Sequence, residues 1–224
     1  IDRISVDAIK DTDKSAYHGA SVASAGLFYS GNALLRAIED AKSQIRNIAA
    51  EIFDVKPDDI EINEGKVYVK SEPSKFVELS EIAMGYMLPN GNIIGGPIIG
   101  RGSYTPSDLT LLDENGQGNP SPFDTFGATA VEVEVDVLTG EVKVLRVAAV
   151  FDVGKGINKG LVMGQIIGGL IMGISTTLYE SLKFDENGVL TNPNLIDYKI
   201  IKADESPQDI IGVLVETPDP RGPL

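Results

Sequence analysis

A single glutamine, Gln165, lies within a run of apolar residues and glycines at 161–178. This run predicts a buried helix that follows a glycine-rich turn at 152–158. An unpaired amide in an apolar environment costs ~1–3 kcal/mol, so a buried glutamine needs a hydrogen-bonding partner. Each glycine costs a helix ~1 kcal/mol relative to alanine. Something is therefore expected to approach this helix closely, at Gly164, Gly168, Gly169 and Gly173, and to bind the amide.

A stretch of small residues at 19–24 is the second candidate site. Small side chains let a ligand approach the backbone, and exposed backbone amides bind anionic oxygens or sulfurs. From the residues alone, a tight packing contact explains the stretch equally well. The candidate residues are Gly19, Ala20, Ser21, Val22, Ala23 and Ser24.

The other candidate groups favour ordinary structural roles. His18 is the only histidine, whereas a catalytic triad or a histidine-based metal site needs further partners, so it is interpreted as a loop histidine. Asp11 and Asp13 are typical of a turn, because aspartate side chains accept hydrogen bonds from nearby backbone amides. The glycines at 95–102 lack the Gly-Lys-Ser/Thr ending of a phosphate loop.

Composition narrows the classes of function. The net charge of −14 argues against nucleic-acid binding, because a phosphate backbone requires a basic stripe and none is visible. The chain has no cysteine, which excludes cysteine-based zinc and iron–sulfur sites within it and fits a reducing, cytoplasmic compartment. Residues 161–178 approach the length of a membrane-spanning helix, but the polar residues among them favour the buried helix of a soluble protein. No signal peptide is expected at the start.

The pattern of apolar residues predicts an α+β fold in which antiparallel hairpins pack with long helices. Helices are expected at 31–53, with Ser30 as its N-cap, and at 79–87. Hairpins are expected at 60–69 and 128–150, and further strands at 4–9 and 210–216. A glycine- and proline-rich loop is expected at 89–124.

Several short motifs, taken in their order along the chain, resemble the molybdenum hydroxylase family of xanthine dehydrogenase and aldehyde oxidoreductase. The resemblance spans essentially the whole chain, and the order of the motifs is more specific than any one of them. The matching residues are Asp11-Thr12-Asp13, Gly19-Ala20-Ser21-Val22-Ala23-Ser24, Ser30-Gly31-Asn32-Ala33, Gly100-Arg101-Gly102, Thr125-Phe126-Gly127-Ala128, Asp152-Val153-Gly154 with Ile157-Asn158, Gly164-Gln165-Ile166-Ile167-Gly168-Gly169, and Pro218 to Leu224.

The resemblance implies that residues 1–224 form the second half of a molybdenum-cofactor-binding domain, with a small inserted subdomain at about 55–88. It implies that Ala20 and Ser21 lie beside the molybdenum, that the stretch from Gly19 to Ser24 binds the cofactor, and that the amide of Gln165 binds the pterin. The helix glycines would then allow close packing against the cofactor or a neighbouring backbone. The cofactor that the resemblance implies is molybdenum-molybdopterin, with the cytosine dinucleotide form as one candidate.

The resemblance also shows departures from the family pattern. The family carries a Gly-Gln-Gly motif upstream of Ile1, and its catalytic glutamate lies in a motif beyond Leu224, so no catalytic residue is assigned here and the chain is expected to be inactive alone. Gln117 does not replace the missing glutamine, because it lies in a proline-rich loop. Lys159 stands where a proline is usual, which is expected to alter the turn but not the chemistry.

The implied reaction is the oxidative hydroxylation of an aldehyde or an N-heterocycle with water. Iron–sulfur clusters and FAD would reside in other domains or subunits. The implied partners are the rest of the large subunit, an iron–sulfur subunit, a flavin subunit and a small-molecule substrate, within an oligomer and without nucleic acid or a membrane. The alternative function is a non-catalytic assembly or scaffold subunit that keeps the fold without the cofactor.

Overall fold

The computed structural model describes residues 4–6, 11–13 and 15–224, and it is a mixture of helices and sheets, as the sequence predicts. The chain divides into two compact units, Ile1–Pro122 with Arg221–Pro223, and Phe123–Pro220 with Leu224. Residues 4–6 are not in a strand, and the rest of the strand expected at 4–9 lies outside the described residues.

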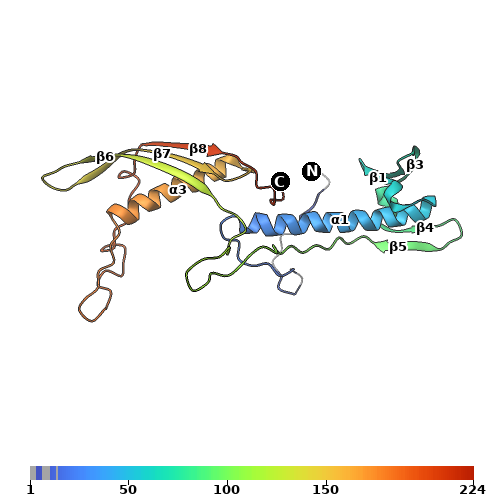
Figure 1. Ribbon diagram of the computed structural model, residues 1–224, viewed down its shortest axis with the longest axis horizontal. Helices are drawn as coiled ribbons and strands as arrows, with labels where there is room; N and C mark the ends of the chain where they lie inside the picture. Colours follow the sequence, from blue (N-terminus) through green and yellow to red (C-terminus); the bar gives the residue numbers. More distant parts are fainter. Residues whose placement is uncertain (1–3, 7–10, 14) are drawn as a thin grey trace. The chain divides into compact units, whose positions relative to one another are not determined.

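The first unit is built on one long helix, α1 (Ala25–Phe53). A short 3-10 turn (Pro57–Asp59) and a three-stranded antiparallel sheet follow it along the chain. Figure 1 shows these elements, and a separate two-stranded sheet, around the C-terminal half of α1. The remaining elements of the unit are β1 (Ile60–Asn63), β2 (Lys66–Val69), β3 (Glu72–Glu78), α2 (Leu79–Ile82), β4 (Met84–Met87) and β5 (Ile93–Pro97).

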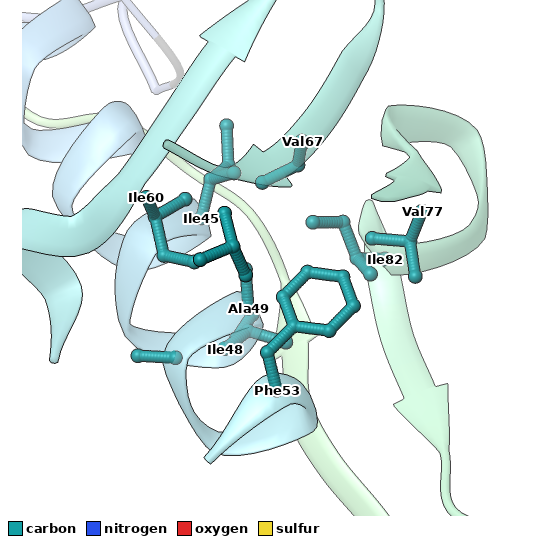
Figure 2. Close-up of a cluster of buried hydrophobic side chains, with 10 residues drawn as sticks. Ile45, Ile48, Ala49, Phe53, Ile60, Val67, Val77 and Ile82 are labelled. Atoms are coloured by element: carbon teal, nitrogen blue, oxygen red, sulfur yellow. The ribbon is translucent and has the colours of Figure 1, made fainter. Parts of the chain in front are cut away.

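The hydrophobic core of this unit lies where α1 ends (Figure 2). Apolar side chains of α1 recur at three- and four-residue spacing and meet alternate residues of β1 and β2. Ile60, Val67 and Ile82 are almost completely buried in this cluster. Residues 57–82 thus share a core with the C-terminal half of α1, and their expected status as an inserted subdomain stays a prediction.

Residues 99–103 run along the middle of α1 at close range. A Cβ atom on Gly100 would lie 2.2 Å from the carbonyl oxygen of Ala37, and one on Gly102 would lie 2.2 Å from that of Ala33. Helix side chains hold this segment through its backbone, since Asp40 accepts a hydrogen bond from the Arg101 N–H (2.9 Å). The Gly100-Arg101-Gly102 motif therefore serves the packing of backbone on backbone.

The second unit is a three-stranded sheet with one helix. Strands β6 (Phe126–Val135) and β7 (Val142–Asp152) form the expected hairpin, and β8 (Asp209–Val215) pairs with β7 in parallel. Helix α3 (Lys159–Leu178) lies on the connection between these two parallel strands and packs on β8, where a Cβ on Gly212 would lie 2.2 Å from the Met163 sulfur. Strand β6 is an edge strand, and all ten of its residues are exposed.

Three boundaries differ from the sequence predictions. Helix α1 begins at Ala25 rather than near 31, so Ser30 lies inside the helix and Ser24 occupies the N-cap position. The helix expected at 79–87 ends at Ile82, because Gly85 adopts a φ of +101° that a helix excludes. The expected loop at 89–124 contains strand β5, which pairs with β4.

The core of the first unit makes a direct prediction for stability. Ile60 is 1% exposed, so Ile60→Ala should lower the free energy of unfolding by about 2–5 kcal/mol through lost burial and a residual cavity. Ile99 is 59% exposed, and Ile99→Ala is the matched control. Chemical denaturation followed by circular dichroism measures both. Equal effects of the two substitutions would contradict the assigned core.

Candidate functional site

Helix α3 is less buried than the sequence predicts. Its sheet covers one side only, and Ser175 is its one buried residue within the described chain. The expectation of a buried helix is therefore wrong for these residues, because apolar composition indicates a need for cover without identifying what supplies it. The exposed residues recur at helical spacing and form a stripe of Leu161, Gly164, Gln165, Gly168, Gly169, Met172, Gly173 and Thr176. We call this the glycine stripe.

Gln165 lies in the glycine stripe with its amide free. The side chain is exposed and makes no hydrogen bond to any of the described residues. The described residues therefore supply no partner for the amide, and the expectation that an approaching group binds it stays a prediction. Cβ atoms built on Gly164, Gly168, Gly169 and Gly173 would have no other heavy atom within 4 Å. The glycines therefore leave the helix backbone open to an external group.

Among the described residues, α3 is the one helix long and apolar enough to cross a membrane by length and composition, with a mean hydropathy of 1.7. Only 6% of its most apolar window is buried. The uncovered glycine stripe accounts for part of this exposure.

An apolar groove of about 390 Å³ lies between α3 and the β6–β7 hairpin, and Gly169 and Gly173 of the glycine stripe line it. Its only polar side chains are two threonines, Thr129 and Thr177. A groove of this kind suits apolar cover rather than a polar cofactor, which needs several converging hydrogen-bonding groups.

Two carboxylates fasten the turn that leads into α3. Asp152 accepts hydrogen bonds from the backbone N–H groups of Gly154 and Thr217, both at 3.0 Å. Glu216 accepts one from the Gly156 N–H (2.9 Å) and pairs with the ammonium group of Lys159. Lys159 thus joins the start of α3 to the residue that follows β8. Sequence analysis missed this arrangement, because nothing in the local sequence pairs residues about sixty positions apart.

The hydrogen bonds of this turn change the acidity of both carboxyl groups. Bonds from the Thr217 hydroxyl and from the backbone N–H groups of Thr217 and Gly154 lower the pKa of Asp152. Bonds from Lys159 and from the Gly156 N–H lower the pKa of Glu216. The Asn158 side chain completes the turn by accepting a hydrogen bond from the Leu161 N–H (3.0 Å), as an N-cap does. The position of Gln165 therefore depends on a turn that the carboxylates of Asp152 and Glu216 hold in place.

The loop at 19–24 has the features expected of an anion-binding backbone. All six residues are exposed, and Ala23 has a φ of +50°, which is uncommon for a residue with a side chain. Ser24 makes no side-chain capping bond, and the first turn of α1 contains no acidic residue. Neither a capping side chain nor an acidic residue of the first turn therefore neutralises the positive end of the helix dipole, which suits a negatively charged group.

His18 and the aspartates take the structural roles expected of them. The His18 ring contacts the hydroxyls of Ser21 (3.2 Å) and Ser30 (3.3 Å). Asp11 accepts a hydrogen bond from the Asp13 N–H, as in a turn (3.0 Å). No group of three or more His, Cys, Asp or Glu residues that could hold a metal ion occurs in the described ranges.

The loop at 19–24 and Gln165 belong to different units of the chain. Their meeting in one site, and the role of each of the six loop residues, stay predictions. What each unit presents by itself is an open backbone surface with unpaired hydrogen-bonding groups.

The carboxylate-fastened turn makes a prediction for acid. A lowered pKa means that Asp152 and Glu216 stabilise the fold above their ordinary pKa values of 3.8 and 4.5, and that this contribution disappears as the pH falls through their lower folded-state values. We expect hydrogen exchange at 153–159, corrected for its intrinsic pH dependence, to accelerate below about pH 4. Asp152→Asn should accelerate this exchange at neutral pH, whereas Asp124→Asn, at an exposed carboxylate, should not. Identical acid profiles for wild type and Asp152→Asn would contradict the assignment.

Comparison with known proteins shows the family of the chain. The profile of the molybdopterin cofactor-binding domain family matches residues 1–207. The chain is 30% identical to the nicotine 6-hydroxylase large subunit of Paenarthrobacter nicotinovorans, over 91% of the chain and 24% of that protein. It is 29% identical to the carbon monoxide dehydrogenase large chain of Hydrogenophaga pseudoflava, over 96% of the chain and 25% of that protein.

Solved structures give the same result. A Cu,Mo-CO dehydrogenase in its carbon monoxide reduced state superposes with a TM-score of 0.71 at 26% identity, over 95% of this chain and 25% of that one. Quinoline 2-oxidoreductase from Pseudomonas putida 86 superposes with a TM-score of 0.69 at 30% identity, over 94% and 25%. The chain spans about a quarter of the length of these relatives. It belongs to the molybdopterin cofactor-binding domain family, within the molybdenum hydroxylases.

Proposed function

We propose that this chain binds the molybdopterin cofactor of an enzyme that oxidatively hydroxylates an aldehyde or an N-heterocycle with water. The observation that carries the proposal is the glycine stripe of α3, where a free amide lies among glycines with open space around them. Exposed apolar helices with several glycines are unstable without a compensating contact, because glycine lowers helix stability and exposed apolar surface is unfavourable. A bound cofactor supplies such a contact.

The described residues fit the cofactor. Gln165 offers both a donor and an acceptor, which suits the polar edge of a pterin. The bare backbone at Gly164 and Gly168, outside the apolar groove, admits a flat ring system without a steric clash. The loop at 19–24 offers backbone N–H groups to anionic oxygens or sulfurs, with Ala20 and Ser21 nearest the metal. The cofactor, when bound, supplies two-electron redox chemistry, and these residues bind and orient it.

The surroundings of the enzyme are part of the proposal. Iron–sulfur clusters and FAD would accept the electrons from other domains or subunits, since this chain has no cysteine to hold a cluster. The remaining part of a large subunit, an iron–sulfur subunit and a flavin subunit would be its partners in an oligomer. The cytosine dinucleotide is the proposed form of the pterin, the cytoplasm the proposed location, and a small molecule the substrate.

Substitution of Gln165 tests the proposal. Gln165→Ala in the complete protein should lower the molybdenum and pterin content, because the cofactor loses a hydrogen-bonding partner worth about 1–3 kcal/mol. Gln117→Ala is the matched control, because Gln117 lies in the exposed loop at 116–118. Inductively coupled plasma mass spectrometry measures the metal, and fluorescence of the oxidised pterin measures the cofactor. The unfolding transition of each variant is recorded alongside.

The outcomes separate the two classes of function. Molybdenum and pterin in the wild type, with a loss confined to Gln165→Ala, support a cofactor-binding enzyme. A well-folded complete protein without molybdenum overturns the proposal and favours the scaffold alternative. Equal cofactor content in all three proteins removes Gln165 from the site.

The glycine stripe gives a second test. Gly168→Ala and Gly168→Leu should raise helix stability by up to about 1 kcal/mol, because the added side chain enters open space and relieves the cost of glycine. The same substitutions should lower the cofactor content in order of size, because the added side chain occupies the space proposed for the cofactor. Thermal unfolding and metal analysis measure the two effects separately. Full cofactor content in Gly168→Leu would contradict cofactor binding at this face.

A further inference from the structure

One turn of α1, formed by Ser30, Gly31 and Asn32, has no role in the function proposed so far. The amide nitrogen of Asn32 donates hydrogen bonds to the carbonyl oxygens of Phe28 (2.9 Å) and Arg221 (3.0 Å). Both partners only accept, so the NH₂ group must face them. Asn32 thereby links its own helix to a segment 189 residues further along the chain, within the same unit.

Two further contacts fix this distant segment, residues 221–223. A Cβ on Gly31 would lie 2.6 Å from Cγ of Pro223, so the proline ring occupies the space that any other residue would fill. The guanidinium of Arg221 pairs with the carboxylate of Asp108 at 3.1 Å. An ion pair this exposed contributes little by itself, but together the contacts fix the segment on both sides of Asn32.

The preceding residue of the same turn contacts the loop at 19–24. The Ser30 hydroxyl lies 3.3 Å from Nδ1 of His18, and Nε2 of His18 lies 3.2 Å from the hydroxyl of Ser21. The ring of His18 therefore bridges the loop to the helix. Three consecutive residues of α1 thus contact two segments that are about two hundred positions apart in the sequence.

We propose that the Ser30–Gly31–Asn32 turn is a positioning element, which holds the cofactor-binding loop and residues 221–223 in fixed places on α1. This inference rests on the proposed function, because its purpose is to fix the loop that contacts the cofactor. Ser30 acts through His18, whereas Gly31 and Asn32 act directly on residues 221–223. None of these residues touches the cofactor, and each acts through the segments it holds.

Asn32→Asp in the complete protein tests the inference. The carboxylate has the shape of the amide but cannot donate, and it would face two carbonyl oxygens. We expect hydrogen exchange at 221–223 to accelerate about tenfold, as a lost hydrogen bond at an anchoring point allows local opening. Asn47→Asp is the matched control, because Asn47 is an exposed residue of the same helix without a hydrogen bond from its side chain to the described residues.

The functional arm measures how fast molybdenum is released on dilution into mild denaturant. Asn32→Asp and His18→Ala should each release molybdenum several-fold faster than wild type and Asn47→Asp. His18→Ala should accelerate exchange at 18–24 and leave 221–223 unchanged. Gly31→Ala, which displaces Pro223, should reproduce the effect of Asn32→Asp and serves as the second variant if Asn32→Asp does not fold.

Each outcome decides the inference. Unchanged exchange at 221–223 in Asn32→Asp and Gly31→Ala shows that the turn does not hold this segment, and this result overturns the inference. Faster exchange with an unchanged release rate leaves a purely structural anchor and also overturns the positioning role. A wild-type protein without molybdenum overturns the proposed function and the positioning role with it, whatever the exchange shows. Faster exchange together with faster release supports the inference.

Discussion

The first unit depends on the unbroken length of helix α1. Its 29 residues contain no proline, and at 1.5 Å per residue they extend about 44 Å. The C-terminal half supplies the core, and the middle carries the closely packed segment at 99–103. The N-terminal third contacts residues 221–223, and the helix begins directly after the loop of small residues at 19–24. The unbroken helix therefore sets the distances between these contacts, and a kink anywhere along it would displace them relative to one another.

Most of the regular structure was predictable, because hairpins and amphipathic helices produce strong periodic patterns. The hairpins at 60–69 and 128–150, strand β8 and helix α3 are confirmed. The start of α1 was missed because small residues such as Ala25 and Gly26 carry no amphipathic signal. Strands β4 and β5 were missed because they are short and rich in glycine. Only the structure shows that the Ser30-Gly31-Asn32 motif receives a segment from the other end of the chain.

For the candidate site, the sequence identified individual residues but not the contacts that hold them in place. Composition alone singled out Gln165 and the residues from Gly19 to Ser24, because an amide among apolar residues and a run of small residues are both unusual. Composition did not reveal that Asp152 and Glu216 fasten the turn before α3, since those contacts join residues distant in sequence. Burial of α3 was predicted wrongly for the same reason. The local sequence indicates that an element needs burial or hydrogen bonds. Which residues supply them is visible only in the three-dimensional structure.

The exposed edge strand β6 has a consequence for handling the protein. Its outer edge presents unpaired backbone groups along ten residues, and Val131 and Val133 line the apolar groove on one face. Glu132 and Glu134 alternate with these valines in the sequence, so their charges point to the opposite face and repel other chains there. Wherever β6 has no covering neighbour, its edge and apolar face form a template for cross-β pairing between molecules. The charges of these two glutamates therefore oppose association on one face of β6 only.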